Sequence, residues 1–307
     1  MSAERVLITG ATGLLGREVV AALGRRGVRP RVLLRSAERR SALPADADVE
    51  VAVGDLGDHA SLGEALAGVD AAFLVTPHDS AEEHLGLTFL SACEAAGVSR
   101  LVLSTAIHPD SGIKPIRNAI YALMGRAGPH YVPKYRVEAA VRDSAVDSVV
   151  LLPANFYQND ELWRPEILSG SYPQPIGKKG TVRVDCRDVG EAAARGLLRE
   201  LDPGVFPMVG PEPRITGPGA AELWQAALGR EVSYVGDELR TWEQAIGERM
   251  APAMREDFRR TYELIQRFAP RGSAGQRART TAALGRPPTS YADYAHDAAA
   301  RWSDSAQ

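Results

Sequence analysis

Short apolar runs alternate with helix-forming stretches along the first half of the chain. Each run is nearly continuous in hydrophobicity, which is typical of strands covered on both faces. The predicted strands are Val6–Thr9, Arg31–Leu34, Val49–Val53, Ala71–Val75, Leu101–Ser104 and Ser148–Leu152. The predicted helices between them are Leu14–Leu23, Ser61–Leu66, Ala81–Ala96 and Lys134–Arg142. This alternation predicts an α/β fold, a Rossmann-type doubly wound parallel sheet whose strands end at one common edge.

The pattern changes after Pro153. Residues 155–180 are rich in Gly, Pro and aromatic side chains and predict an irregular substrate lobe. Later elements are expected as helices at Asp188–Arg199, Ala220–Leu228, Thr241–Glu248, Glu256–Phe268 and Tyr291–Trp302, and as a strand at Val205–Val209. Residues 270–290 are expected to form a loop-rich link. We therefore expect a sheet domain over residues 1–154, completed by 181–210, and a smaller C-terminal lobe from residues 155–180 and 211–307.

Composition narrows the classes of function. The 307 residues are 45% hydrophobic and 24% charged, with a formal net charge of -3, so bulk positive charge for nucleic-acid binding is missing. The two cysteines, Cys93 and Cys186, lie far apart, which argues against a disulfide framework. No window approaches the roughly 18 apolar residues of a membrane span, and no motif with metal-ligand spacing appears. We expect a cytoplasmic protein with no membrane partner and no metal.

A glycine motif follows the first predicted strand. Gly10, Gly13 and Gly16 form the pattern G-x-x-G-x-x-G immediately before a helix. Gly10 permits a tight turn, Gly13 lets the backbone approach a pyrophosphate, and Gly16 lets the helix pack closely on the strand. The helix N-terminus then offers free N–H groups to the anion, and Thr12 can add a hydroxyl. The predicted dinucleotide contacts here are Gly10, Thr12, Gly13, Leu14, Leu15 and Gly16.

The end of the second strand predicts which coenzyme is bound. An acidic residue there would hold the ribose 2′-hydroxyl of NAD, but this chain has Arg35 and Ser36. A guanidinium can grip a 2′-phosphate with two hydrogen bonds, so NADP is expected in preference to NAD. The alternative is a solvated arginine at a strand end.

Three further strand ends are expected to face the same crevice. Asp55 can accept from the adenine amino group, or it can simply cap a turn. The hydroxyls after the fifth strand can contact substrate or nicotinamide, or act as caps. The predicted contacts at these ends are Asp55, Leu56, Val75, Thr76, Pro77, Ser104 and Thr105. By contrast, Asp79, Glu82 and Glu83 are interpreted as acids that favour a helix N-terminus.

Together with these features, three later segments resemble the NmrA-like atypical short-chain dehydrogenases/reductases. They are His130–Glu138 (HYVPKYRVE), Leu152–Asn159 (LPANFYQN) and Gly285–Tyr291 (GRPPTSY). The resemblance covers essentially the whole chain. Within the family, the chain looks most similar to the subgroup that contains triphenylmethane reductase and NADPH-dependent quinone oxidoreductases. The resemblance implies NADP binding with Pro153, Asn155 and Phe156 at the coenzyme. The family also includes redox-sensing regulators that bind NADP without known turnover.

The predicted catalytic residues depart from the Tyr-x-x-x-Lys pattern of ordinary short-chain dehydrogenases. His130 stands at the tyrosine position, four residues before Lys134, and Tyr131 is displaced by one. Lys134 is predicted to hold the nicotinamide ribose; the alternative is a surface lysine. His130 has a pKa suited to proton transfer, and Tyr131 is a weaker candidate. Because Pro133 favours a first helical turn, the helix is expected to begin near it, which would leave His130 on a loop.

The preferred function is an NADPH-dependent reductase that transfers hydride to a small, aromatic or conjugated acceptor such as a quinone or imine. The alternatives are a non-catalytic NADP(H)-sensing regulator with a protein partner and a cofactor-binding enzyme with non-redox chemistry. The apolar segment Ile107–Gly128 is expected either to cover the substrate as a lid or to pack on the second lobe or on a homodimer partner.

Overall fold

The computed structural model describes residues 4–77 and 81–304, so the prediction for Asp79 lies outside the described residues. The chain divides into two compact units. The first contains residues 1–125, 129–153 and 186–207, and the second contains residues 126–128, 154–185 and 208–307. The chain thus passes between the units after Gly125, Gly128, Pro153, Asp185 and Pro207.

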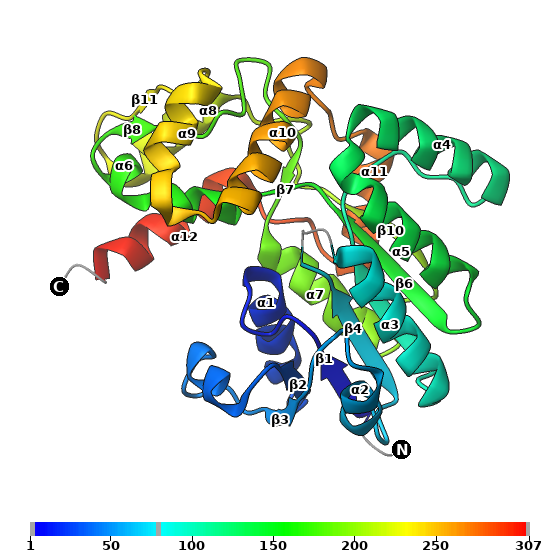
Figure 1. Ribbon diagram of the computed structural model, residues 1–307. Coiled ribbons are helices and arrows are strands. Elements are labelled where there is room, and N and C mark those ends of the chain that lie inside the picture. The colour runs from blue at the N-terminus through cyan, green and yellow to red at the C-terminus, as the bar shows by residue number, and fades with distance from the viewer. Residues whose placement is uncertain (1–3, 78–80, 305–307) are drawn as a thin grey trace. The chain divides into compact units, whose positions relative to one another are not determined.

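A seven-stranded sheet forms the centre of the first unit (Figure 1). Its strands are β1 (Val6–Ile8), β2 (Arg31–Leu34), β3 (Glu50–Val53), β4 (Ala71–Val75), β5 (Arg100–Ser104), β6 (Asp147–Pro153) and β10 (Gly204–Met208). They lie in the order β10-β6-β5-β4-β1-β2-β3, and the pairs from β6 across to β3 are parallel. The predicted Rossmann-type sheet is confirmed. The order reverses between β1 and β4, which is where such sheets bind ligands.

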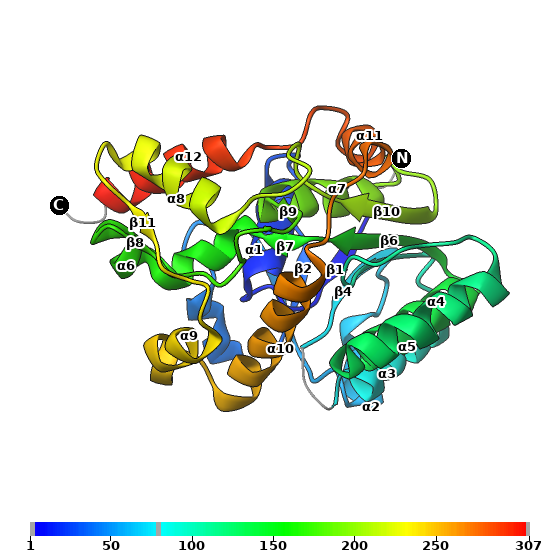
Figure 2. The same cartoon turned by 90° about the horizontal axis from the view of Figure 1, so that it is seen from above.

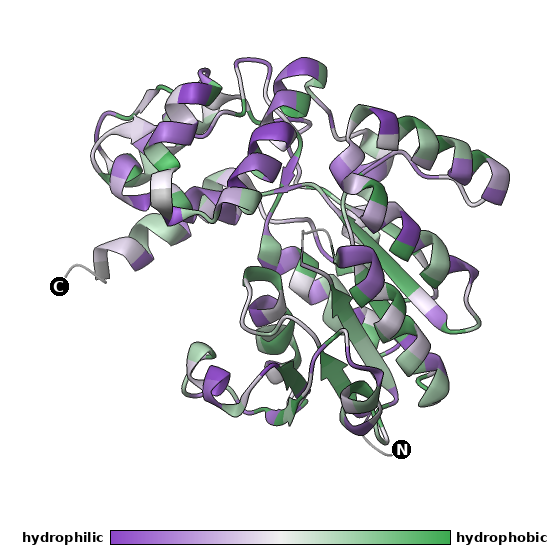
Figure 3. Cartoon of the chain, in the orientation of Figure 1, coloured by the Kyte–Doolittle hydropathy of each residue, from purple (hydrophilic) through white to green (hydrophobic). Residues whose placement is uncertain are grey.

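Helices cover both faces of this sheet. The helices that accompany these strands along the chain are α1 (Leu14–Gly24), α2 (His59–Ala65), α3 (Glu82–Ala95), α4 (Lys114–Ala127), α5 (Val132–Asp143) and α7 (Cys186–Leu197), with 3-10 turns at η1 (Ala37–Ala42) and η2 (Pro129–Tyr131). Helix α7 packs on α1, whereas α3 packs on α2 and α5. Figure 2 shows α7 on one side of the sheet and α2, α3 and α5 on the other. Strands β1, β4 and β6 are strongly apolar (Figure 3), as burial on both faces requires.

The second unit is mostly helical. It contains β7 (Asn155–Phe156), η3 (Tyr157–Trp163), α6 (Arg164–Leu168), β8 (Ser171–Tyr172), β9 (Arg183–Val184), α8 (Gly217–Leu228), β11 (Ser233–Tyr234), α9 (Leu239–Ile246), η4 (Gly247–Arg249), α10 (Pro252–Phe268), α11 (Ala274–Leu284) and α12 (Tyr291–Asp304). Its core is built from aromatic side chains, among them Trp163, Trp224, Tyr172 and Tyr291.

A buried ion pair lies inside this aromatic core. The Arg183 guanidinium donates to Asp160 Oδ1 at 2.9 Å, and both side chains are fully buried. Tyr172, Tyr291 and the indole of Trp224 also donate to the Asp160 carboxylate. With its hydrogen-bonding groups paired in this way, the ion pair has the arrangement that makes burial of two charges tolerable.

The expectation of a loop-rich link over residues 270–290 is wrong. Residues 274–284 form helix α11, which begins with a capping box: the Ser273 hydroxyl accepts from the Gln276 backbone N–H, and the Gln276 side chain accepts from the Ser273 N–H. The flanking Gly and Pro residues masked this signal, although Ser followed three residues later by Gln is a recognised helix start.

Candidate active site

The glycine motif forms a turn that no larger residues could form. Gly10 has a φ of +63°, and the carbonyl of Gly10 accepts from the Gly13 N–H at 2.9 Å. A Cβ on Gly16 would lie only 2.2 Å from that same carbonyl oxygen. Helix α1 therefore packs against the end of β1 at backbone contact distance, as the sequence predicts.

The N-terminus of α1 is open to a ligand. Gly13 is its N-cap and provides no side-chain cap, and the first turn contains no acidic residue. Gly13 and Leu14 are exposed, Thr12 is half-buried, and Leu15 and Gly16 are buried. The first N–H groups of a helix have no partner within the helix, so this turn can bind an anion.

Arg35 and Asp55 lie together at the ends of β2 and β3. Arg35 Nε is 4.0 Å from Asp55 Oδ2, and both side chains are mostly exposed. Asp55 also has a local structural role, since its Oδ1 accepts from the Gly57 N–H at 2.8 Å. The Ser36 hydroxyl hydrogen-bonds to Glu38 and lowers the pKa of that carboxyl group. Arg35 is thus available to a phosphate, whereas Ser36 already has an anionic partner.

The β1 and β4 ends are joined beside the glycine turn. The Thr9 hydroxyl accepts from the Val75 N–H at 3.1 Å, and a Cβ on Gly10 would meet Val75 Cγ1 at 2.6 Å. Val75 therefore lies against the turn, and its predicted contact with the coenzyme stays a prediction. Pro77 and Leu56 are half-buried, and Leu56 packs against the apolar core beneath the sheet, so their predicted coenzyme contacts stay predictions.

Lys134 is held by an acid whose role the sequence does not reveal. Glu82 Oε1 accepts from the Lys134 ammonium group and, at 2.5 Å, from the Thr76 hydroxyl. The Glu82 side chain is fully buried and that of Lys134 is 11% exposed. Within the described residues, Glu82 is the only partner of the ammonium group, which has three N–H donors. The available signal was an acidic residue at the start of the helix after β4, which is ordinarily explained by the helix dipole.

His130 and Tyr131 lie immediately before the helix that contains Lys134. They belong to the 3-10 turn η2, which runs directly into α5 at Val132. Their rings contact each other with centroids 4.4 Å apart, and the Tyr131 ring stacks on Tyr135 at 6.3 Å. His130 is therefore in a helical turn rather than on the expected loop.

An unsatisfied hydroxyl lies at the end of β5. The Thr105 N–H donates to the Leu151 carbonyl, but its buried Oγ1 has no hydrogen-bond partner within the described residues. Ser104 is buried, and Pro153 accepts from the Ile107 N–H at the neighbouring strand end. A buried hydroxyl without a partner is unusual and is explained most simply by a bound ligand or water.

Two predicted coenzyme contacts belong to the second unit. Asn155 and Phe156 form strand β7, where Arg183 donates to the Asn155 side-chain oxygen at 3.0 Å and to the Phe156 carbonyl at 2.6 Å. Their assignment to the coenzyme stays a prediction.

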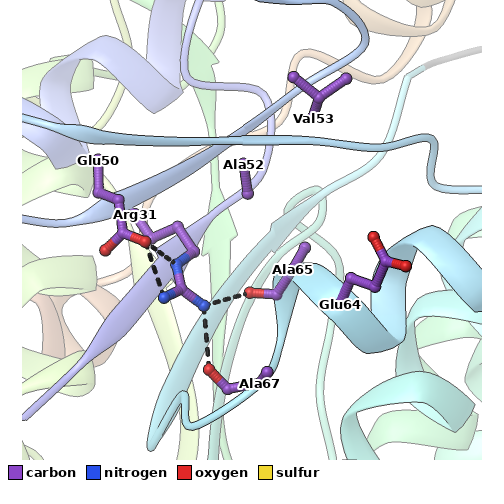
Figure 4. A pocket seen from close by; sticks show the side chains of 7 residues that line it. All are labelled: Arg31, Glu50, Ala52, Val53, Glu64, Ala65 and Ala67. Carbon is purple, nitrogen blue, oxygen red and sulfur yellow. Dashed lines mark hydrogen bonds and ion pairs between the residues drawn. The ribbon is translucent and has the colours of Figure 1, made fainter.

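A shallow hollow beside the outer strand β3 contains none of the predicted site residues. It has a volume of about 270 Å³ and is lined by Arg31, Glu50 and neighbours from β3 and α2 (Figure 4). Its lining runs from Glu50 to Val53, the first and last residues of β3, so the hollow lies along this outer strand of the sheet. Arg31 is already paired with Glu50 and with the carbonyls of Ala65 and Ala67.

The described residues contain neither a metal centre nor a membrane-spanning helix. No group of His, Cys, Asp or Glu in residues 4–77 and 81–304 is arranged to hold a metal ion. Over the same residues, no helix has both the length and the hydropathy that a bilayer crossing demands.

The chain is similar to known proteins over most of its length. An NAD(P)H azoreductase from Xenophilus azovorans is 29% identical over 299 residues, which covers 94% of this chain and 96% of the relative. A (4-alkanoyl-5-oxo-2,5-dihydrofuran-3-yl)methyl phosphate reductase from Streptomyces griseus is 31% identical over 262 residues, covering 84% of this chain and 86% of the relative. The structure of Citrobacter sp. triphenylmethane reductase complexed with NADP(H) has the same fold, with a TM-score of 0.77 and 20% identity over 96% of this chain and 99% of that chain. The NmrA-like family matches residues 2–284, and the chain belongs to this family.

Proposed function

We propose that the protein is an NADPH-dependent reductase that transfers hydride to a small conjugated acceptor. The main support for this proposal is the N-terminus of α1, whose first N–H groups have no side-chain cap. The turn before it brings the backbones of Gly10 and Gly16 into contact. That arrangement lies beside the reversal of strand order between β1 and β4, where a dinucleotide fits.

Residues along one edge of the sheet supply the other contacts. The N–H groups at the start of α1 bind the pyrophosphate, and Arg35 binds the 2′-phosphate. The hydroxyl of Thr105 provides a further hydrogen-bond donor at the end of β5. When bound, NADPH supplies a hydride with its electron pair.

Lys134 is the residue that we place at the reacting end. Its ammonium group is fixed by Glu82 and keeps two N–H groups for ligand hydroxyls within the described part of the chain. His130 or water delivers the proton that completes the reduction. Water is sufficient as the proton donor where hydride transfer leaves a stable anion, and no proton is needed where a cationic acceptor becomes a neutral carbon centre.

The relatives support the class of acceptor. One is named for azo compounds, and another for an unsaturated lactone phosphate. Both groups are conjugated double bonds that accept a hydride. We therefore propose a conjugated, electron-poor acceptor for this chain.

The test is a turnover assay with a panel of acceptors. Purified protein and NADPH are mixed with quinones, azo dyes, triarylmethane dyes and unsaturated lactones, and loss of nicotinamide absorbance is followed. The proposal expects oxidation with at least one acceptor, and one two-electron reduction of that acceptor for each NADPH consumed. Tight NADPH binding without turnover on any acceptor would instead place the chain with non-catalytic NADP(H) sensors.

A further inference from the structure

We propose that Glu82 is a positioning residue for Lys134, and that it fixes the lysine ammonium group for contact with the coenzyme. This inference rests on the proposed function. Glu82 begins α3, Thr76 follows β4, and Lys134 is in the first turn of α5. One carboxylate oxygen therefore joins three segments at the edge of the sheet where the coenzyme would bind.

A close contact between two helices places the pair. A Cβ on Gly86 would lie 2.5 Å from Val137 Cγ2, so α3 and α5 are in close contact there. Glu82 is four residues before Gly86, and Lys134 is three residues before Val137. Residues at these spacings share a helix face, so the two side chains meet one turn above the contact.

The pair is poorly explained by the stability of the fold alone. A lysine in the first turn of a helix opposes the helix dipole, and a buried ion pair is often no more stabilising than apolar residues of the same volume. Sequences break such local rules mainly at functional sites.

The buried ion pair of Asp160 with Arg183 differs from that of Glu82 with Lys134 in how fully its cation is paired. Arg183 uses its Nε and both terminal nitrogens on protein partners, which is typical of a structural role. Lys134 has one protein partner within the described residues and keeps two N–H groups. An ammonium group on a flexible four-carbon stem gains most from such an anchor, because the anchor selects one position before the ligand arrives.

The reactivity of the Lys134 amine can be measured directly, because the chain contains only four lysines: Lys114, Lys134, Lys178 and Lys179. Competitive acetylation followed by mass spectrometry measures the reactivity of each amine without coenzyme. An ammonium group hydrogen-bonded to a buried carboxylate is a poor nucleophile, so Lys134 should react slowly. Glu82→Gln replaces a charged hydrogen-bond acceptor by a neutral one and so weakens the bond that holds the amine, which should raise its reactivity about tenfold relative to Lys178.

The matched control is Glu83→Gln. Glu83 pairs with Arg136 at 2.8 Å between the same two helices, but at the surface. This variant should leave Lys134 reactivity unchanged. The double variant Glu82→Gln/Lys134→Met removes both charges together and should fold even if a single variant does not.

Coenzyme binding completes the test. Fluorescence titration with NADPH should show weaker binding in Glu82→Gln and in Lys134→Met, and no further loss when both are combined, because Glu82 acts through Lys134. NADPH should also protect Lys134 from acetylation. Unchanged Lys134 reactivity in Glu82→Gln, or additive losses in the double variant, would overturn the positioning role. A changed reactivity with no NADPH binding to the unaltered protein would overturn the proposed function, while still showing that Glu82 holds the lysine.

Discussion

Gly16 and Gly10 are in backbone contact across the turn between β1 and α1, where a Cβ on Gly16 would lie 2.2 Å from the Gly10 carbonyl oxygen. The helix cannot move away without carrying its N-terminus off the strand end. We therefore expect Gly16→Ala to abolish measurable NADPH binding and to destabilise the fold by about 1–3 kcal/mol.

Gly24 provides the comparison. It is the last residue of the same helix, and a Cβ there meets nothing within 4 Å. Gly24→Ala should keep coenzyme binding and stabilise the protein by up to about 1 kcal/mol, because glycine is a poor helix former. Thermal melts and NADPH titrations of both variants check this pair; similar behaviour of the two variants would contradict it.

Arg35 should determine the preference for NADPH over NADH. Its guanidinium is mostly exposed and only 4.0 Å from Asp55, a weak interaction that a phosphate can replace. Arg35→Ala should weaken NADPH binding roughly 10- to 100-fold, the size of one or two charge-assisted hydrogen bonds, and leave NADH nearly unaffected. Arg29→Ala removes an exposed arginine that pairs with Asp48 instead, and should change neither affinity. Equal losses for the two coenzymes in Arg35→Ala would rule out the 2′-phosphate role.

His108 should make the stability of the first unit depend on pH. Its Nε2 lies 2.8 Å from Glu138 and its Nδ1 lies 2.7 Å from the Pro109 carbonyl, so both nitrogens face acceptors. Burial alone lowers the pKa of His108, but the hydrogen bond and the charge of Glu138 outweigh burial, and the pKa is raised above 6.5.

A histidine whose pKa is higher in the folded than in the unfolded state binds its proton more tightly when the protein is folded. Its full stabilisation is therefore present below about pH 6.5, and it is lost as the pH rises through the pKa of the folded state. The free energy of unfolding should therefore fall above pH 6.5, by at most about 1.4 kcal/mol per pH unit. His108→Gln should remove this slope, whereas His59→Gln at an exposed position should retain it. Urea melts from pH 6 to 9 measure the slope; an unaltered slope in His108→Gln would exclude this histidine as its source.

Asp160 should be essential for the second unit. Asp160→Asn leaves the buried Arg183 guanidinium without its counter-charge, which typically destabilises a protein by about 3–5 kcal/mol. Glu166→Gln is the control in the same unit, since its ion pair with Arg249 is partly exposed and should contribute less than about 1 kcal/mol. Denaturant melts should separate the two variants clearly, and a loss in Asp160→Asn no larger than that in Glu166→Gln would show that the buried pair is dispensable.

The local pattern of the chain predicts the elements of the sheet and the glycine turn well. Continuous apolar runs and the spacing of Gly10, Gly13 and Gly16 are properties of neighbouring residues, and they require no knowledge of distant contacts. The capping signal at Ser273 and Gln276 is likewise a property of neighbouring residues, so it could be predicted from the sequence. The nearby Gly and Pro residues favour a loop and obscure this signal.

Contacts between distant segments account for what the sequence does not reveal. The role of Glu82 depends on Lys134, 52 positions away, and on the close approach of Gly86 and Val137. Likewise, Asp160 and Arg183 are separated by 23 positions and meet only in the folded second unit. A single sequence supplies the residue types for such pairs but not the distance between them.

The most direct measurement is calorimetric titration of the protein with NADPH, alongside the Gly16→Ala and Gly24→Ala variants. The account predicts saturable binding of one NADPH per chain to the unaltered protein and to Gly24→Ala, and none to Gly16→Ala. Absence of binding to the unaltered protein at millimolar NADPH, or equal binding to all three, would contradict it.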